Sequence, residues 1–238
     1  MVFDGASFAM NHRAELTHQL QEFAEVTELI DIHNQQPTKG QLAAPQLPIA
    51  SIYQALCLGV KDYIRKNGFP GALLGLSGGI DSALTLAIAV DALGADNVRT
   101  VMMPSQYTAD ISLADANEMV ELLGIKHYQC SIQSLFDQYL STVEADFHIS
   151  PDPNGSNTMP ENLQARIRGT LLMALSNQSG SIVLTTGNKS EMAVGYCTLY
   201  GDMAGGFAVL KDISKTMVYQ LCEYRNQINP VIPERIIQ

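Results

Sequence analysis

One stretch of eight residues combines glycines, hydroxyls and a carboxylate at the junction of two apolar runs: Gly75, Leu76, Ser77, Gly78, Gly79, Ile80, Asp81 and Ser82. The run before it is typical of a buried strand and the run after it of an alanine-rich helix. The start of a helix presents unpaired N–H groups and the positive end of the helix dipole, so it attracts anions. Gly78 and Gly79 can adopt positive φ and let a ligand approach the backbone, while Ser77 and Ser82 add hydroxyl donors. The stretch therefore predicts a loop that wraps phosphates.

Asp81 distinguishes this loop from the common P-loop, which ends in Gly-Lys-Ser or Gly-Lys-Thr. A carboxylate beside phosphates is expected where Mg²⁺ bridges the two, because Mg²⁺ binds one or two carboxylates together with phosphate oxygens. The alternative is a glycine turn in which Ser77 or Asp81 caps the following helix.

A second polar group follows the apolar run 181–186. Thr186, Gly187 and Asn188 lie where that predicted strand ends, and Glu191 lies in the helix that starts there. The carboxyl ends of parallel strands meet at one edge of a sheet, so Glu191 can reach the same phosphates as Asp81. The alternative is a first-turn glutamate that the helix dipole favours.

Asn162 and Arg166 are four residues apart in a predicted helix and so share one face of it. An amide and a guanidinium together can bind a carboxylate or a pyrophosphate, the guanidinium through two parallel hydrogen bonds. The alternative for Arg166 is a solvated surface arginine.

The positions of these residues depend on an alternation of strand and helix patterns that begins near Ile49. This alternation predicts an α/β fold, a doubly wound and mostly parallel sheet with helices on both faces. Strands are predicted at 71–76, 98–103, 125–130 and 181–186, helices at 49–67, 82–93, 111–123, 132–143, 161–175 and 214–224, and a loop at 149–160. The N-terminal segment 1–30 contains a turn signal at Asp4-Gly5 and a strand candidate at 15–20, and the proline-containing segment 31–48 is predicted to be a linker.

Composition narrows the functional classes. The chain has 238 residues and a net charge of −10, which disfavours general nucleic-acid binding. The four cysteines show no C-x-x-C spacing and lie in apolar stretches, so buried, reduced thiols are expected; the five histidines show no zinc-ligand spacing. No signal peptide is visible, and the longest apolar stretch, 83–90, is too short to span a bilayer. We therefore expect a cytoplasmic protein that does not contact membranes.

The loop "SGGIDS" resembles the pyrophosphate loop of the ATP pyrophosphatases, which include GMP synthetase, asparagine synthetase and NAD synthetase. "ENLQARIRG" (161–169) and "TTGNKSEMAVGYCTLYGD" (185–202) are similar to NAD synthetase in particular. This resemblance covers about 49–238 and implies a fold like that of the adenine nucleotide alpha hydrolases. "VFDGASF" (2–8) looks like the last hairpin of the nitrilase-like glutaminase domain of glutamine-dependent NAD synthetases, so residues 1–30 are interpreted as a remnant of that domain.

The resemblance also implies roles for single residues. Asp81 and Glu191 would hold Mg²⁺ on the ATP phosphates, and the stretch from Gly75 to Ser82 would wrap ATP, with Thr186 and Lys215 as further ATP contacts. Asn162 and Arg166, together with Glu191, would contact deamido-NAD. The alternative for Lys215 is a lysine at a helix start, exposed to water.

The implied reaction is the ATP-dependent amidation of deamido-NAD to NAD through an adenylated intermediate, with release of pyrophosphate and AMP. Ammonia would come from glutamine through a glutaminase domain, and the enzyme would be a homodimer at its core. Leu199 precedes Tyr200-Gly201-Asp202 where ammonia-only relatives have lysine, which fits the glutamine-dependent branch. A further C-terminal segment with another substrate-binding lysine is expected beyond Gln238. Two alternatives are a nucleotide-binding fragment without full activity and another amide ligase of the ATP pyrophosphatase type.

Overall fold

The computed structural model describes residues 2–147 and 158–238. The chain divides into two compact units, residues 1–59 and 60–238. Most of the predicted loop at 149–160 lies outside the described residues. Among the described residues, no helix is long and apolar enough to cross a lipid bilayer.

The first unit contains two short antiparallel hairpins. Strand β1 (Phe8–Met10) pairs with β2 (Leu16–Gln19), which confirms the strand predicted at 15–20. The segment 31–48, expected to be a linker, contains a second hairpin of β3 (Ile32–His33) and β4 (Gln36–Pro37). Its turn residues Asn34 and Gln35 have φ of 49° and 63°, as a tight two-residue hairpin turn requires. The dipeptide Asn-Gln is not a strong signal for such a turn, so the sequence did not predict it.

Helix α1 (Pro48–Lys66) begins at a proline, whose fixed φ suits the first helical position. The helix ends just before Gly68, which has a φ of 73° and so takes the left-handed conformation that commonly ends helices. Both ends agree with the predicted helix at 49–67.

The second unit is built on a five-stranded sheet with the order β7-β6-β5-β8-β9. All neighbouring strands are parallel. The strands are β5 (Ala72–Gly75), β6 (Val98–Met102), β7 (Lys126–Gln129), β8 (Ile182–Thr185) and β9 (Phe207–Ala208). The first four confirm the predicted strands. The sequence did not predict β9, because it has only two residues and follows two glycines.

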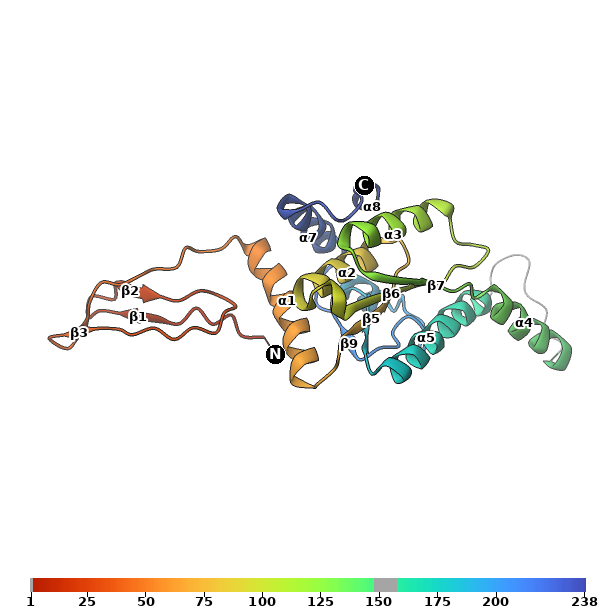
Figure 1. The fold of residues 1–238 in the computed structure, drawn as a ribbon, viewed down its shortest axis with the longest axis horizontal. Helices are drawn as coiled ribbons and strands as arrows, with labels where there is room; N and C mark the ends of the chain where they lie inside the picture. Colours follow the sequence, from red (N-terminus) through yellow and green to blue (C-terminus); the bar gives the residue numbers. More distant parts are fainter. Residues whose placement is uncertain (1, 148–157) are drawn as a thin grey trace. The chain divides into compact units, whose positions relative to one another are not determined.

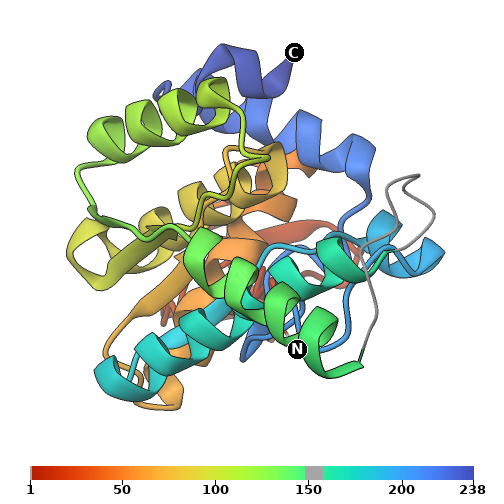
Figure 2. The same ribbon diagram turned by 90° about the vertical axis from the view of Figure 1, so that its right-hand side faces the viewer.

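Helices cover both faces of this sheet, as Figures 1 and 2 show, which confirms the predicted doubly wound α/β fold. One face carries α2 (Ile80–Leu93), α3 (Asp110–Leu123) and α7 (Lys215–Ile228); the other carries α4 (Gln133–Phe147) and α5 (Met159–Ser179). Three short helices complete the unit: η1 (Ala95–Asn97), α6 (Lys189–Val194) and α8 (Glu234–Ile237).

The core holds the strand ends in place. Strand residues alternate between the two faces of the sheet, and both faces are buried here. Leu73, Val101 and Val183 pack with Ile167 and Leu172 of α5. On the opposite face α2 is buried along most of its length, which is typical of a helix at the centre of a domain.

The cysteines differ from the expectation of buried thiols. Cys222 is fully buried and Cys57 is half-buried, but Cys130 and Cys197 are exposed. The expectation is therefore wrong for Cys130 and Cys197. Cys130 follows the edge strand β7. Cys197 lies in the segment after α6, and the apolar residues of that segment are themselves exposed.

Candidate functional site

The loop between β5 and α2 has the left-handed residue that its glycines predicted, but at one position only. Gly78 has a φ of 80°, whereas Gly79 is extended, with φ −90° and ψ 159°. A Cβ at Gly78 would lie 2.5 Å from the carbonyl oxygen of Ser112 in the first turn of α3. Gly78 therefore lets α3 pack against the loop, while the exposed Gly79 is open to a ligand.

The hydroxyls of Ser77 and Ser82 hold the shape of this loop. They lie 3.0 Å from one another, and the Ser82 hydroxyl donates to the Gly79 carbonyl at 2.9 Å. The Gly79 N–H donates to the Ser77 hydroxyl at 3.2 Å. In this structure these hydroxyls bond within the loop, and their expected role as donors to a ligand stays a prediction.

The first turn of α2 presents further donors. This helix begins at Ile80, two residues before the predicted start, so Asp81 and Ser82 lie inside its first turn. The N–H of Ala83 donates to the carbonyl of Gly79, so the three preceding N–H groups have no helical partner. They make the loop a suitable binding site for an anion.

Asp81 is the point where three helices meet. Its carboxylate forms an ion pair with Lys215, the first residue of α7, and accepts a hydrogen bond of 2.9 Å from the Asn188 amide. Asn188 is the N-cap of α6. Lys215 therefore contacts the site although its side chain is 40% exposed, and its implied role as an ATP contact stays a prediction.

Asn188 connects Asp81 to Glu191. It is fully buried, and its side-chain oxygen accepts from the Glu191 N–H at 3.0 Å. The Glu191 carboxylate in turn accepts from the Asn188 N–H at 3.0 Å, which completes a capping box. The sequence carried this signal, because an asparagine followed three residues later by glutamate is a helix-start pattern. The predicted set of site residues nevertheless omitted Asn188.

The two carboxylates fit the preferences of Mg²⁺ but do not form a complete cage. Among residues 2–147 and 158–238, no group of three or more His, Cys, Asp or Glu side chains could hold a metal ion. Mg²⁺ commonly binds through one or two carboxylates together with phosphate oxygens. Asp81 and Glu191, joined through Asn188, are a donor set of this kind.

A cavity of about 400 Å³ opens beside the loop and is called here the strand-end cavity. It lies at the carboxyl ends of β5, β6 and β8, where the strand order reverses and where α/β proteins bind their ligands. Its walls are partly apolar, so a flat ring can be buried there. The lining residues include Gly75, Leu76, Ser77, Met102, Met103, Leu172, Leu184 and Thr186.

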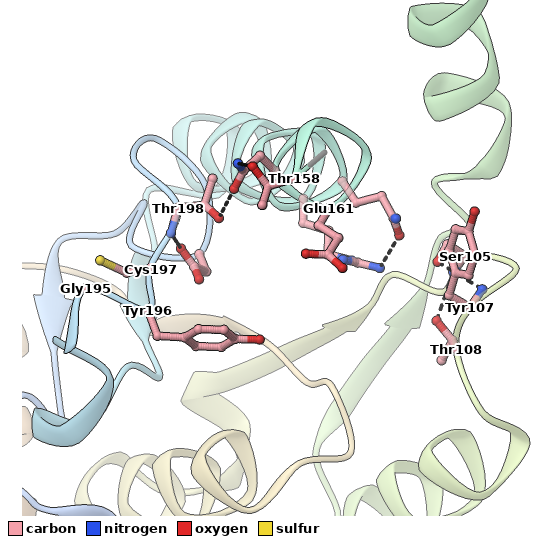
Figure 3. A pocket seen from close by; sticks show the side chains of 13 residues that line it. Ser105, Tyr107, Thr108, Thr158, Glu161, Gly195, Tyr196, Cys197 and Thr198 are labelled. Carbon is pink, nitrogen blue, oxygen red and sulfur yellow. Dashed lines mark hydrogen bonds between the residues drawn. The ribbon is translucent and has the colours of Figure 1, made fainter. Parts of the chain in front are cut away.

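A second cavity, of about 580 Å³, is called here the tyrosine cavity because Tyr107 and Tyr196 line it. Figure 3 shows Thr158 and Glu161 of the α5 region on one side and the loop from Ser105 to Thr108 on another. The ring of Tyr196 extends into the space between them. Asn162 also lines this cavity and accepts a hydrogen bond of 2.8 Å from the Thr198 hydroxyl.

The two arginines of α5 differ in position. Arg166 is exposed, donates to the carbonyl oxygen of Leu199 at 3.2 Å, and is not among the described residues that line either cavity. Arg168, which was not among the predicted site residues, lines both cavities. Its Nε donates to the Met103 carbonyl at 3.1 Å. Burial lowers the pKa of Arg168 from its ordinary value, yet a guanidinium stays charged at neutral pH.

Glycines bring α5 close to the segment that follows α6. A Cβ at Gly169 would lie 2.7 Å from the carbonyl oxygen of Gly201, and a Cβ at Gly201 would lie 2.9 Å from the side-chain Cβ of Ala165. The segment around Gly201 therefore packs directly on the helix. Asp202, beside this contact, lines both cavities and accepts a hydrogen bond of 2.7 Å from the Thr198 N–H.

Curated relatives of this chain are glutamine-dependent NAD(+) synthetases. That of Acinetobacter baylyi is 50% identical over the whole of this chain and 44% of its own length. That of Synechocystis is 43% identical, over the whole of this chain and 42% of its own length. The chain thus spans less than half the length of these relatives.

Solved structures agree with the fold. The glutamine-dependent NAD+ synthetase from Acinetobacter baumannii, in complex with ADP, matches with a TM-score of 0.94 at 49% identity, over 99% of this chain and 45% of that one. The NMN synthetase from Francisella tularensis matches with a TM-score of 0.72 at 29% identity, over 81% of this chain and 75% of that one. The sequence model of the family described as NAD synthase matches residues 52–238. This chain therefore belongs to the NAD synthase family.

Proposed function

We propose that this chain is the synthetase part of a glutamine-dependent NAD synthetase. ATP would adenylate the nicotinate carboxylate of deamido-NAD, pyrophosphate would leave, and ammonia would displace AMP to give NAD. The observation that carries the proposal is the meeting of Asp81, Asn188 and Lys215 at a helix start beside the strand-end cavity. Membership of the NAD synthase family supports it independently.

ATP fits with its adenine in the strand-end cavity and its phosphates on the loop from Gly75 to Ser82. The apolar part of the walls would accommodate the base, and the N–H groups at the start of α2 that have no helical partner would bind phosphate oxygens. Thr186 lines the cavity and would contact ATP, while Lys215 would move from Asp81 to a phosphate oxygen. Mg²⁺, held by Asp81 and Glu191, would neutralise the phosphates and favour departure of pyrophosphate.

Deamido-NAD fits in the tyrosine cavity. Asn162 lines that cavity and holds Thr198, and Arg166 holds the neighbouring Leu199, so both fix the segment that forms one wall. The exposed ring of Tyr196 offers a flat apolar face to the nicotinate ring. We propose that Glu191 completes the site from the start of α6.

No side chain has to act as a covalent nucleophile in this reaction. Catalysis would come from holding two substrates in contact and from charges and N–H groups that stabilise the leaving pyrophosphate. Ammonia would come from the glutaminase region of a longer protein, and residues 1–30 would be part of that region. We also propose that the synthetase assembles as a homodimer, as the resemblance implies, and that the protein acts in the cytoplasm.

The test is product formation by the chain with ATP, Mg²⁺, deamido-NAD and ammonium. We expect NAD and AMP in equal amounts, and neither when Mg²⁺ is removed with EDTA. Binding of ATP without any product would instead support a nucleotide-binding fragment. AMP release only with another acceptor would support a different amide ligase. Deamido-NMN is the acceptor to compare first, because the Francisella relative is an NMN synthetase.

A further inference from the structure

The strand-end cavity and the tyrosine cavity share part of their walls. Three residues line both: Thr108, Arg168 and Asp202. If ATP and the acceptor occupy one cavity each, as the proposed function requires, their reacting atoms meet beside this shared wall. The shared residues are therefore the ones placed to act on the reaction itself.

Arg168 differs from Thr108 and Asp202 in carrying a positive charge. Among the described residues that line the two cavities, Arg168 is the only cation, whereas Asp202 and Glu161 are acidic. Asp202 is also held by the N–H of Thr198, and Thr108 accepts a hydrogen bond of 3.0 Å from the N–H of Ser105. Positive charge on the shared wall thus comes from Arg168.

The adenylation step concentrates negative charge at that wall. A carboxylate oxygen of the acceptor forms a bond to the α-phosphorus of ATP, and the bond from that phosphorus to the β-phosphate oxygen breaks. The electron pair leaves with pyrophosphate, so no proton transfer is needed. In the transition state the carboxylate and the non-bridging α-phosphate oxygens are close together, and a fixed cation stabilises such an arrangement.

Hydrogen bonds fix the Arg168 side chain before any substrate is bound. Its Nε donates to the Met103 carbonyl, and a second nitrogen lies 3.4 Å from the Gln164 side-chain oxygen. A guanidinium has five N–H donors in a fixed plane, so others remain for a ligand. The side chain is half-buried, and a partly desolvated charge acts more strongly on its neighbours than one in water.

We propose that Arg168 contacts both the acceptor carboxylate and the α-phosphate of ATP and stabilises the transition state of adenylation. This assignment rests on the proposed function. It differs from the role implied for Arg166, which lies two residues away. Arg166 is not one of the described residues that line either cavity.

The experiment measures exchange of labelled pyrophosphate into ATP by the full chain, with deamido-NAD and Mg²⁺ present and ammonium absent. This exchange reports adenylation alone. We expect Arg168→Ala to lower the exchange rate by about 100-fold or more, as is typical when one donor to a transition state is removed. Binding of ATP, measured by calorimetry, should weaken far less than exchange, because the loop from Gly75 to Ser82 would hold most of the phosphate contacts. The matched control is Arg65→Ala, which removes an exposed arginine from the end of α1 and should leave both measurements unchanged.

Two further measurements distinguish a role of Arg168 in the transition state from a merely structural role. Arg168→Lys keeps the charge and should retain more exchange than Arg168→Ala, and low concentrations of guanidinium should partly restore exchange to Arg168→Ala. Loss of ATP binding in step with exchange, without such rescue, would overturn the assignment, as would an alanine variant as active as the parent. A parent chain that gives no exchange would overturn the proposed function, and this assignment with it.

Discussion

At the scale of single residues, the Asp81 carboxylate is held by two side chains, those of Lys215 and Asn188. A bound nucleotide would affect both contacts. The ion pair with Lys215 balances the carboxylate, while Asn188 fixes its direction. Asp81 is largely shielded, with its side chain 17% exposed, and Lys215 is 40% exposed. Lys215 is thus the more accessible partner and can turn toward a phosphate while Asn188 keeps Asp81 in place.

We predict that Asp81→Asn weakens Mg²⁺-dependent binding of ATP by about tenfold or more, or about 1.4 kcal/mol. The substitution removes the charge that Mg²⁺ needs but keeps the shape of the side chain. Binding in EDTA should change little. Calorimetry with and without Mg²⁺ measures both, and Asp62→Asn, which removes a partner from the exposed pair with Lys66, is the control. Equal losses with and without the metal would point to a purely structural role.

The cysteines allow a prediction of pH-dependent reactivity. Burial, and then the nearby charge of Asp81, raises the pKa of Cys222 to about 12. The thiolate is the reactive form, and its fraction falls tenfold for each pH unit below the pKa, so Cys222 should stay unmodified at pH 8. Iodoacetamide should modify the exposed Cys130 and Cys197 at this pH.

Peptide mass spectrometry measures this labelling. Deamido-NAD should protect Cys197, which lines the tyrosine cavity, but not Cys130. Modification of Cys222 at pH 8 in the folded chain would contradict its burial. Equal labelling of Cys197 with and without a saturating acceptor would place the acceptor elsewhere.

At the scale of elements, the loop from Gly75 to Ser82 is shaped by the helix that packs on it as much as by its own residues. Gly78 adopts a φ of 80° and lies against the backbone of Ser112 at the start of α3. Gly79 has a φ that any residue can adopt, and within the described part of the chain a Cβ there would have only the Ser77 hydroxyl within 4 Å, at 3.3 Å. The two adjacent glycines therefore serve different purposes, one in packing and one in access.

We predict that Gly78→Val lowers the free energy of unfolding by at least ~2 kcal/mol, because it combines positive-φ strain with overpacking against α3. Gly79→Ala should leave stability close to that of the parent but reduce ATP affinity, since it adds a methyl group where the backbone meets the phosphates. Thermal unfolding and calorimetry separate the two effects. A Gly78→Val protein as stable as the parent would contradict the packing role of this glycine.

The sequence predicted the long elements well because hydrophobic periodicity is a local signal. Strands β5 to β8 and the long helices were found in this way, with ends shifted by a few residues, as at Ile80. β9 was missed because a two-residue strand is defined by its pairing with β8 and not by its own residues. The hairpin around Asn34 and Gln35 was missed because its turn lacks glycine.

The arginines of α5 show why part of the candidate site could not be predicted. The sequence indicates Arg166 because it shares a helix face with Asn162 and matches the family pattern, and its contact with deamido-NAD stays a prediction. Two residues turn an α-helix by about 200°, so Arg168 points to a different side. The packing of Ile167 and Leu172 on the sheet decides which side faces the cavities. That choice depends on tertiary contacts, which helical spacing alone does not reveal.

At the scale of the whole molecule, the candidate site belongs to one of the two compact units. The loop from Gly75 to Ser82, the contacts of Asp81 and both cavities are formed by residues of the unit 60–238. This unit has its own buried core around Leu73, Val101 and Val183, and a unit with its own core is expected to fold alone. The boundary between the units lies within α1, so a division that keeps this helix whole has to be made before Pro48.

We predict that a chain of residues 48–238 binds ATP with the same affinity as the full chain, since every residue assigned to the ATP site is retained. It should also unfold in one cooperative transition. Calorimetry and circular dichroism measure these properties, and Asp81→Asn in the shortened chain should lose Mg²⁺-dependent affinity as it does in the full chain. If the shortened chain folds but binds ATP more weakly, residues 1–47 contribute to the site directly, and the assignment of the site to the second unit is incomplete. A shortened chain that fails to fold would show that the first unit stabilises the second.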